Sequence, residues 1–157
     1  MALIILDETE STNTLTLRMA REENAPHGTA VLALRQTAGH GQHSRPWDSP
    51  LGGMYLSVVF RGEIPQTVAI GEIVRGFLVE ITGSHEFTIK LPNDILYQGR
   101  KICGILIESI TQGASSYGVI GIGLNINNKY AGGANLKEII GEQDVAEIAG
   151  EIARRIV

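Results

Sequence analysis

Three short apolar segments in the middle of the chain follow one another too closely to be joined by helices. They span residues 87–91, 95–98 and 102–108, with three residues between one segment and the next. A parallel strand pair needs a crossover of roughly a dozen residues or more, whereas an antiparallel pair can be joined by a tight turn. We therefore predict antiparallel hairpins here, with a turn near Gln98 and Gly99, rather than a doubly wound parallel sheet.

The rest of the chain alternates between strand and helix patterns. Strands are predicted at residues 2–6, 28–35, 54–60 and 117–126. Helices are predicted from Thr12 or Asn13 to about Glu23, from Pro65 to residue 82, and from Asp144 to Val157. Their expected apolar faces are Leu15, Leu17 and Met19 in the first, Val68, Ile73, Phe77 and Ile81 in the second, and Val145, Ile148, Ile152 and Ile156 in the third.

This order of elements predicts one α+β domain over residues 1–157, with helices flanking a mixed, mainly antiparallel sheet.

The formal net charge of −4 gives no basic excess, so we expect no nucleic-acid surface. The apolar runs are too short to span a bilayer and the N-terminus lacks a basic n-region, so we expect a cytoplasmic protein without a membrane segment. The single cysteine, Cys103, excludes an intrachain disulfide and is expected to be a small core residue.

Several common site motifs are absent or incomplete. Neither GxxxxGK[ST] nor GxSxG occurs, and the segment GIGLNI ends in Ile126 where a dinucleotide fingerprint needs glycine. His40 and His43 have a metal-like HxxH spacing, but zinc takes three or four protein ligands and the other histidines lie far away in the sequence. We therefore interpret both as ordinary loop histidines.

Positive charge is concentrated near the predicted hairpins. The chain has four lysines, and Lys90 and Lys101 lie close together on either side of Asp94. A strand-ending turn explains the sequence Pro-Asn-Asp but not the second lysine. If Lys90 and Lys101 lie on neighbouring strands, two ammonium groups and a magnesium-binding carboxylate can converge. That combination suits phosphoryl or adenylyl chemistry, in which negative charge builds on oxygen.

The loop GHGQHSRPWDSP, residues 39–50, has features of a ligand-binding segment. Gly39 and Gly41 allow close approach of the backbone, Arg45 offers a fixed fork for phosphate or carboxylate, and Trp47 offers an apolar face. A mobile surface turn is the alternative. Residues 10–13 cap the predicted helix and leave spare hydroxyl and amide groups for a polar ligand.

Taken in order, these segments resemble the catalytic domain of biotin protein ligases in the biotin/lipoate protein ligase family. The resemblance covers nearly the whole chain from Asp7 onward. It rests on D-E-T-x-S-T-N at 7–13, Q-T-A-G-H-G-Q-H-S-R-P-W at 36–47, S-P-x-G-G-x-Y-L-S at 49–57, K-L-P-N-D-I at 90–95, G-R-K-I-C-G-I-L-I-E at 99–108 and G-I-G-L-N-I-N at 121–127.

The resemblance implies a fold like that of class II aminoacyl-tRNA synthetases and a two-step reaction. The biotin carboxylate attacks the α-phosphate of ATP with Mg²⁺, and a lysine of a biotin carboxyl carrier domain then attacks the biotinyl-5′-adenylate. The implied catalytic residues are Lys101, Lys90 and Arg45, with Asp94 as the metal ligand. The implied biotin-binding residues are Ser11, Thr12, Asn13, Gln36, Gly39, His40, Gly104 and Leu106, and the implied nucleotide-binding residues are Gly41, Gln42, Trp47, Asn93 and Asn125.

Three departures from the family pattern matter. The loop has His40, Gln42 and His43 where the usual pattern is rich in arginine, and Leu91 replaces a tryptophan. The third departure is that the sequence ends at Val157, where family members generally carry a small SH3-like domain, so we expect neither that C-terminal domain nor an N-terminal DNA-binding domain. The resemblance also implies a homodimer formed by joining sheets. A lipoate or octanoate ligase or transferase, and a degenerate protein that binds biotin or its adenylate without completing transfer, stay open as alternatives.

Overall fold

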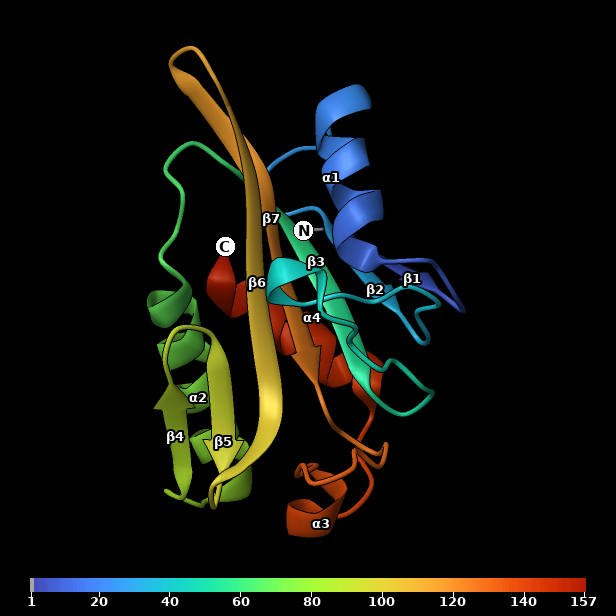
Figure 1. Ribbon diagram of the computed structural model, residues 1–157, viewed down its shortest axis with the longest axis vertical. Coiled ribbons are helices and arrows are strands. Elements are labelled where there is room, and N and C mark those ends of the chain that lie inside the picture. The colour runs from blue at the N-terminus through green and yellow to red at the C-terminus, as the bar shows by residue number, and fades with distance from the viewer. Residues whose placement is uncertain (1) are drawn as a thin grey trace.

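A seven-stranded sheet forms the centre of the computed structural model, which describes residues 2–157 (Figure 1). The strand order is β1-β2-β3-β7-β6-β5-β4, in which β1 and β2 pair in parallel and the other neighbours pair antiparallel. This confirms the predicted mixed, mainly antiparallel sheet. The strands are β1 (Leu3–Leu6), β2 (Ala30–Ala33), β3 (Met54–Arg61), β4 (Phe87–Lys90), β5 (Asp94–Tyr97), β6 (Arg100–Gln112) and β7 (Ser115–Leu124).

The helices lie on both faces of the sheet. Helix α1 (Thr12–Glu22) lies over β3 and β7 on one face, and α2 (Thr67–Thr82) and α4 (Val145–Ile156) cover the other (Figure 1). Alternation along β3 explains this division, because successive side chains of a strand point to opposite faces. Leu56 and Val58 join the main core under α2 and α4, whereas Ser57 forms hydrogen bonds with α1.

Two predicted helix faces need correction. In α2 the buried stripe is Ile70, Val74, Phe77 and Leu78, and Val68 and Ile73 are exposed because they lie off that stripe. In α1 the buried residues are Thr12, Asn13, Thr16 and Ala20, whereas the predicted Leu15, Leu17 and Met19 are only partly buried. The inward face of α1 is polar because its first turn borders a pocket. The predicted face of α4 is confirmed at Ile148, Ile152 and Ile156, with Val145 partly buried.

Some helices and strands differ in their bounds from the prediction, and the reasons are local. Strands β6 and β7 extend into a long exposed hairpin that carries polar residues and therefore lacked an apolar pattern (Figure 1). A 3-10 turn (η1, Gln42–Ser44) and the short helix α3 (Lys137–Ile140) were not predicted. Helix α1 begins where predicted, because Ser11 Oγ accepts a hydrogen bond from the amide of Thr14 at 3.3 Å. In the described part of the chain, the helices are too short or too polar to cross a membrane.

Cys103 is fully buried in the main core, as expected for a structural cysteine. Burial raises the pKa of its thiol to about 12, because the thiolate loses its solvation. We therefore predict that the folded protein resists iodoacetamide at pH 8 and that labelling appears only on unfolding. The pKa of the Cys103 thiol is higher in the folded protein than in the unfolded protein. The free energy of unfolding should therefore fall as the pH rises from the unfolded-state pKa toward 12. Mass spectrometry after timed alkylation measures the first effect, and rapid labelling of folded protein would contradict it.

Candidate active site

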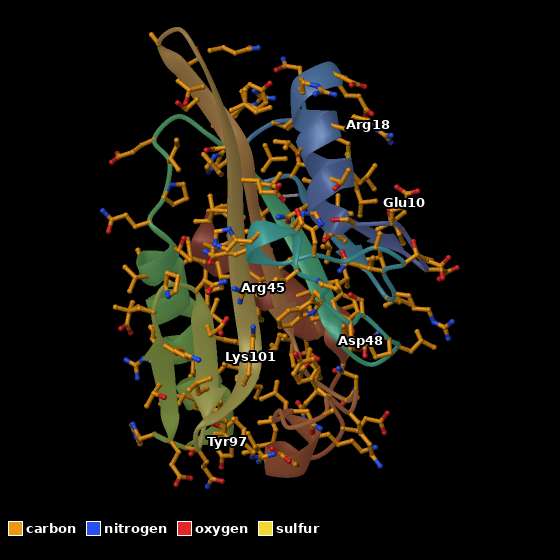
Figure 2. All side chains as sticks on the ribbon, in the orientation of Figure 1. Glu10, Arg18, Arg45, Asp48, Tyr97 and Lys101 are labelled. Carbon is orange, nitrogen blue, oxygen red and sulfur yellow. The ribbon has the colours of Figure 1, made fainter. Side chains whose placement is uncertain are left out.

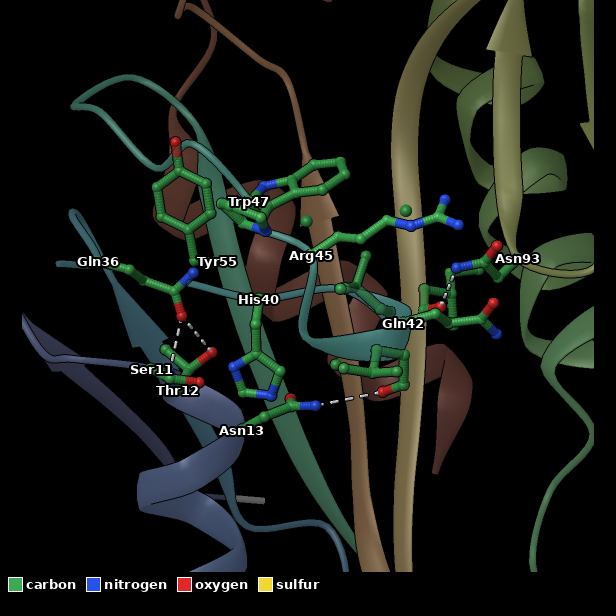
Figure 3. Close-up of a pocket in the computed structure, with 18 of the residues that line it drawn as sticks. Ser11, Thr12, Asn13, Gln36, His40, Gln42, Arg45, Trp47, Tyr55 and Asn93 are labelled. Atoms are coloured by element: carbon green, nitrogen blue, oxygen red, sulfur yellow. Dashed lines mark hydrogen bonds between the residues drawn. The ribbon is translucent and has the colours of Figure 1, made fainter. Parts of the chain in front are cut away.

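A pocket of about 230 Å³ lies between the sheet, the N-terminus of α1 and the loop that joins β2 to β3 (Figure 3). Its floor is formed by glycines on the face of β6 and β7 that points toward α1. Gly104 pairs with Gly123, and Leu106 pairs with Gly121. Because three of these four positions lack a Cβ, the sheet surface is hollow at this point, and side chains from elsewhere in the fold lie in the hollow.

Trp47 lies across one glycine pair. A Cβ at Gly104 would come within 2.8 Å of the indole Cζ3, and a Cβ at Gly123 within 2.7 Å of Cε2. The ammonium group of Lys101 lies 4.8 Å from the ring centroid, and the ring of Tyr130 lies at 6.0 Å with an interplanar angle of 18°. The indole Nε1 is buried and has no hydrogen-bond partner among residues 2–157. The pocket therefore contains a fixed aromatic face with an unused donor.

The end of the pocket at α1 is polar but carries few charges. Gln36 Oε1 accepts hydrogen bonds from the Thr12 amide at 2.8 Å and the Thr12 hydroxyl at 3.2 Å (Figure 3). Gln36 Nε2 donates to Ser49 Oγ at 2.9 Å, which orients the carboxamide. Asn13 Nδ2 donates to Glu108 Oε1 at 2.9 Å, and Asn13 Oδ1 lies 2.5 Å from the Ser57 hydroxyl. This network fixes donors and acceptors in place before a ligand binds.

The other end of the pocket is cationic. Lys101 (Figure 2) has its Nζ 3.0 Å from Asp94 Oδ1, and Arg45 extends from the loop toward Asn93, which precedes Asp94 (Figure 3). Asp94 is mostly buried, with 18% of its side chain exposed, and its Oδ1 has no hydrogen-bond partner besides this ion pair. Asn93 Nδ2 donates to the carbonyl of Ile105 at 3.2 Å, which holds the turn against β6. Two cations and one carboxylate favour an anionic group here.

The structure brings most of the predicted residues to one pocket. Those that line it are Ser11, Thr12, Asn13, Gln36, His40, Gly41, Gln42, Arg45, Trp47, Asn93, Asp94, Lys101, Gly104 and Leu106. Most of them were selected through the family resemblance, and their roles stay predictions. Their convergence follows from the sheet order, which places β6 and β7 side by side under α1 and the loop.

Three predicted residues do not line the pocket. Gly39, the first residue of the loop, lies against Gln36 and Ser49, and a Cβ there would come within 2.6 Å of Gln36 Nε2 and of Ser49 Oγ. Asn125 is fully buried past the end of β7, with Nδ2 unpaired. Lys90 is exposed on β4. Lys90 and Lys101 do not lie on neighbouring strands, because β5 separates β4 from β6, so the condition for the convergence of their ammonium groups is not met.

Several lining residues were missed by the sequence analysis. Gly121 and Gly123 were quoted only as part of a motif, although alternating glycines in a strand are a signal for close approach by another group. Tyr55 lines the pocket, and its hydroxyl donates to the Pro50 carbonyl at 2.7 Å. Burial raises the pKa of Tyr55, so its phenol stays neutral. Nothing in the sequence singled out Tyr130. The others are Pro46, Leu56, Ile105 and Ile122.

The two loop histidines have different surroundings. His40 Nε2 lies 3.2 Å from Glu108 Oε1, whereas His43 is exposed and has a left-handed φ of 57°. Within residues 2–157, no group of three or more His, Cys, Asp or Glu side chains is arranged to hold a metal ion by itself. A divalent cation at Asp94 would therefore need ligands from a bound substrate or from water.

Comparison with known proteins identifies the family of the chain. Residues 5–125 match the model of the biotin/lipoate A/B protein ligase family, and the chain belongs to that family. It is 38% identical over 136 residues to the bifunctional ligase/repressor BirA of Bacillus subtilis, covering 81% of this chain and 41% of BirA.

Solved structures of biotin protein ligases share the fold. The ligase of Aquifex aeolicus in complex with biotin and ATP superposes with a TM-score of 0.82 at 32% identity, covering 99% of this chain and 68% of that one. The ligase of Leishmania major in complex with biotinyl-5-AMP gives a TM-score of 0.81 at 25% identity, covering 99% and 73%. The chain spans 41% of the length of the Bacillus relatives it matches.

Proposed function

We propose that this chain is the catalytic domain of a biotin protein ligase. In the first step the biotin carboxylate attacks the α-phosphate of ATP, forming biotinyl-5′-adenylate and releasing pyrophosphate. In the second step a lysine amine of a carrier domain attacks the acyl carbon and AMP leaves. The observation that carries the proposal is the polarity of the pocket, with an uncharged hydrogen-bonding end at α1 and a cationic end at Lys101 and Arg45.

The uncharged end suits the ureido ring of biotin. A ureido group offers one carbonyl acceptor and two N–H donors, and Ser11, Thr12 and Gln36 offer hydroxyl and carboxamide partners. Gly104 and Leu106 on β6, with Asn13 and His40 opposite, enclose the apolar part of the ligand. Fixed polar groups in an otherwise apolar pocket supply orientation and specificity.

The cationic end suits the reacting oxygens. Two anions must meet in the first step, so the Lys101 ammonium between the biotin carboxylate and the α-phosphate lowers their repulsion and stabilises charge in the transition state. Trp47 offers the adenine a stacking face, and Gly41, Gln42 and Asn93 border the same space. The loop then covers the mixed anhydride and excludes water from it. We assign Arg45 to the phosphates. The family resemblance also implies Lys90 for the phosphates and Asn125 for the adenine, but Lys90 is exposed on β4 and Asn125 is fully buried, and neither lines the pocket.

Magnesium fits the residues at this end as a substrate-borne ion. Asp94 supplies one largely buried carboxylate whose Oδ1 is engaged by Lys101 alone, and Mg²⁺ is usually held by one or two carboxylates together with substrate phosphates. When bound, the ion would neutralise phosphate charge. Asp94 also holds the Lys101 ammonium group in place through their ion pair. This positioning is done by the protein's own residues.

One assay separates this proposal from its alternatives. The protein is mixed with biotin, ATP, Mg²⁺ and a biotin carboxyl carrier domain, and pyrophosphate release and carrier mass are followed separately. Both signals support the ligase. Pyrophosphate without carrier labelling indicates a half-enzyme, and bound biotin with neither signal indicates a degenerate binding protein. Activity with lipoate or octanoate alone would overturn the proposal.

The family resemblance also implies a homodimer. The edge strand β1, with its exposed Ile4 and Ile5, is a candidate surface for it, and sedimentation velocity tests whether the protein dimerises.

The loop chemistry gives a further prediction. Gln42 borders the pocket where the family resemblance expects arginine, so the loop offers less fixed charge to the adenylate phosphate. We expect Gln42→Arg to slow dissociation of biotinyl-adenylate by about tenfold, the effect of one hydrogen bond to a charged group. The dissociation rate is measured by trapping released adenylate, with His43→Arg, an exposed position on the same loop, as the control. An unchanged rate in Gln42→Arg would contradict the prediction.

A further inference from the structure

Glu108 joins two separate walls of the pocket. It lies on β6, and its Oε1 accepts a hydrogen bond from Asn13 Nδ2 at 2.9 Å and lies 3.2 Å from His40 Nε2. Asn13 belongs to the first turn of α1, and His40 belongs to the loop between β2 and β3. Because an ionised carboxylate only accepts hydrogen bonds, His40 Nε2 must carry the proton. One oxygen atom therefore connects three segments of the fold.

The bond from His40 is the one that ties the tip of the loop to the rest of the molecule. The other hydrogen bonds of residues 40–47 stay inside the loop, such as Gly41 N to Arg45 O at 2.8 Å and Trp47 N to Gly39 O at 2.8 Å. Among the hydrogen bonds of residues 2–157, only that between His40 and Glu108 links residues 40–47 to an element outside residues 36–50. The tip would otherwise be held only by packing of Trp47 and its neighbours.

The bond from Asn13 fixes the opposite wall. The Asn13 carboxamide lies flat over Gly121, where a Cβ would come within 2.7 Å of its Cγ. It is held by Ser57 on one side and by Glu108 and the Leu106 carbonyl on the other. Glu108 thus sets the position of a pocket-lining side chain without lining the pocket itself.

The place of Glu108 along the strand keeps its charge away from the anionic part of a ligand. Glu108 lies seven positions after Lys101, which at about 3.3 Å per residue corresponds to roughly 23 Å of strand. A carboxylate beside Lys101 would compete with a bound phosphate, whereas here it contacts a histidine and a carboxamide.

We propose that Glu108 is a positioning residue that latches the 39–47 loop over the pocket through His40 and aligns Asn13 at the same time. Glu108 is the last residue of the motif at 99–108 and is not among the site residues that the family resemblance implies. The latch predicts that His40 and Glu108 act as one unit in loop closure. The role of the latch in retaining biotin rests on the proposed function. The existence of the latch does not depend on that function.

Trp47 offers a direct readout, because it is the chain's only tryptophan and lies in the same loop. Acrylamide quenching of its fluorescence is measured without any ligand. We expect Glu108→Ala and His40→Ala each to increase opening of the loop by about tenfold, as for loss of one hydrogen bond to a charged group. The double variant should show no larger effect than either single variant, because both changes remove the same bond. His40→Arg keeps a donor and should stay close to the original protein.

The control is Glu80→Ala, which removes a carboxylate from an exposed ion pair with Arg155 and should leave quenching unchanged. Additive effects of His40→Ala and Glu108→Ala, or unchanged quenching in both folded single variants, would overturn the latch. If Glu108→Ala fails to fold, His40→Ala alone decides, because His40 lies in a loop outside the core. Biotin dissociation is then measured in the same variants. A protein that binds no biotin but shows the quenching pattern would refute the proposed function and keep the latch.

Discussion

Replacing Lys101 with alanine is expected to lower the rate of biotinyl-adenylate formation by about two to three orders of magnitude while the fold is retained. The ammonium group lies at the cationic end of the pocket, 3.0 Å from Asp94 and 4.8 Å from the Trp47 ring centroid. Without it, the biotin carboxylate and the α-phosphate would approach each other with their charges less compensated. Pyrophosphate release under single-turnover conditions measures the effect.

Two companion variants separate charge from packing. Lys101→Met keeps the apolar stem over Trp47 and removes only the charge, so it should be as slow as Lys101→Ala. Lys137→Ala removes an exposed lysine of α3 and should leave the rate unchanged. Both Lys101 variants leave Asp94 without its ion pair, which should cost about 1 kcal/mol of stability because the pair is partly solvated. An unchanged rate in the folded Lys101→Met variant would mean that the reacting groups lie elsewhere.

The second large effect is expected from one methyl group at Gly121. In Gly121→Ala the new Cβ would lie within 2.7 Å of Asn13 Cγ and Nδ2, so the Asn13 carboxamide must leave its bonds with Ser57 and Glu108. Overpacking of this kind costs about 1–3 kcal/mol, and we expect biotin affinity to fall by about 5- to 150-fold. Isothermal titration calorimetry with biotin measures the change in dissociation constant.

Gly76→Ala is the matched control for the same substitution. Gly76 lies on the exposed side of α2, and a Cβ there would meet nothing within 4 Å. The variant should bind biotin as the original does and should be more stable by roughly 0.5–1 kcal/mol, because alanine favours the helix. If Gly121→Ala bound biotin normally, Asn13 would not be part of the binding wall.

Much of the fold followed from local sequence. Three residues between successive apolar segments leave room for turns but not for helices, so the antiparallel half of the sheet could be predicted. The face of α4 could be predicted because its apolar residues follow the helical period. The face of α1 could not, because three of its four buried residues are polar, and no hydrophobic pattern marks a helix that borders a pocket.

The chain by itself also determined which residue types the pocket would contain, since Ser11, Gln36, Arg45, Asp94 and Lys101 lie in recognisable segments. Only the tertiary structure decided which of them meet. Lys90 lies apart from Lys101 because β5 lies between their strands. Trp47 packs on Gly104 and Gly123 because these two glycines lie opposite each other on β6 and β7. The contact between His40 and Glu108 joins residues 68 positions apart. Such contacts depend on sheet order and register, which long-range packing fixes and local sequence patterns do not encode.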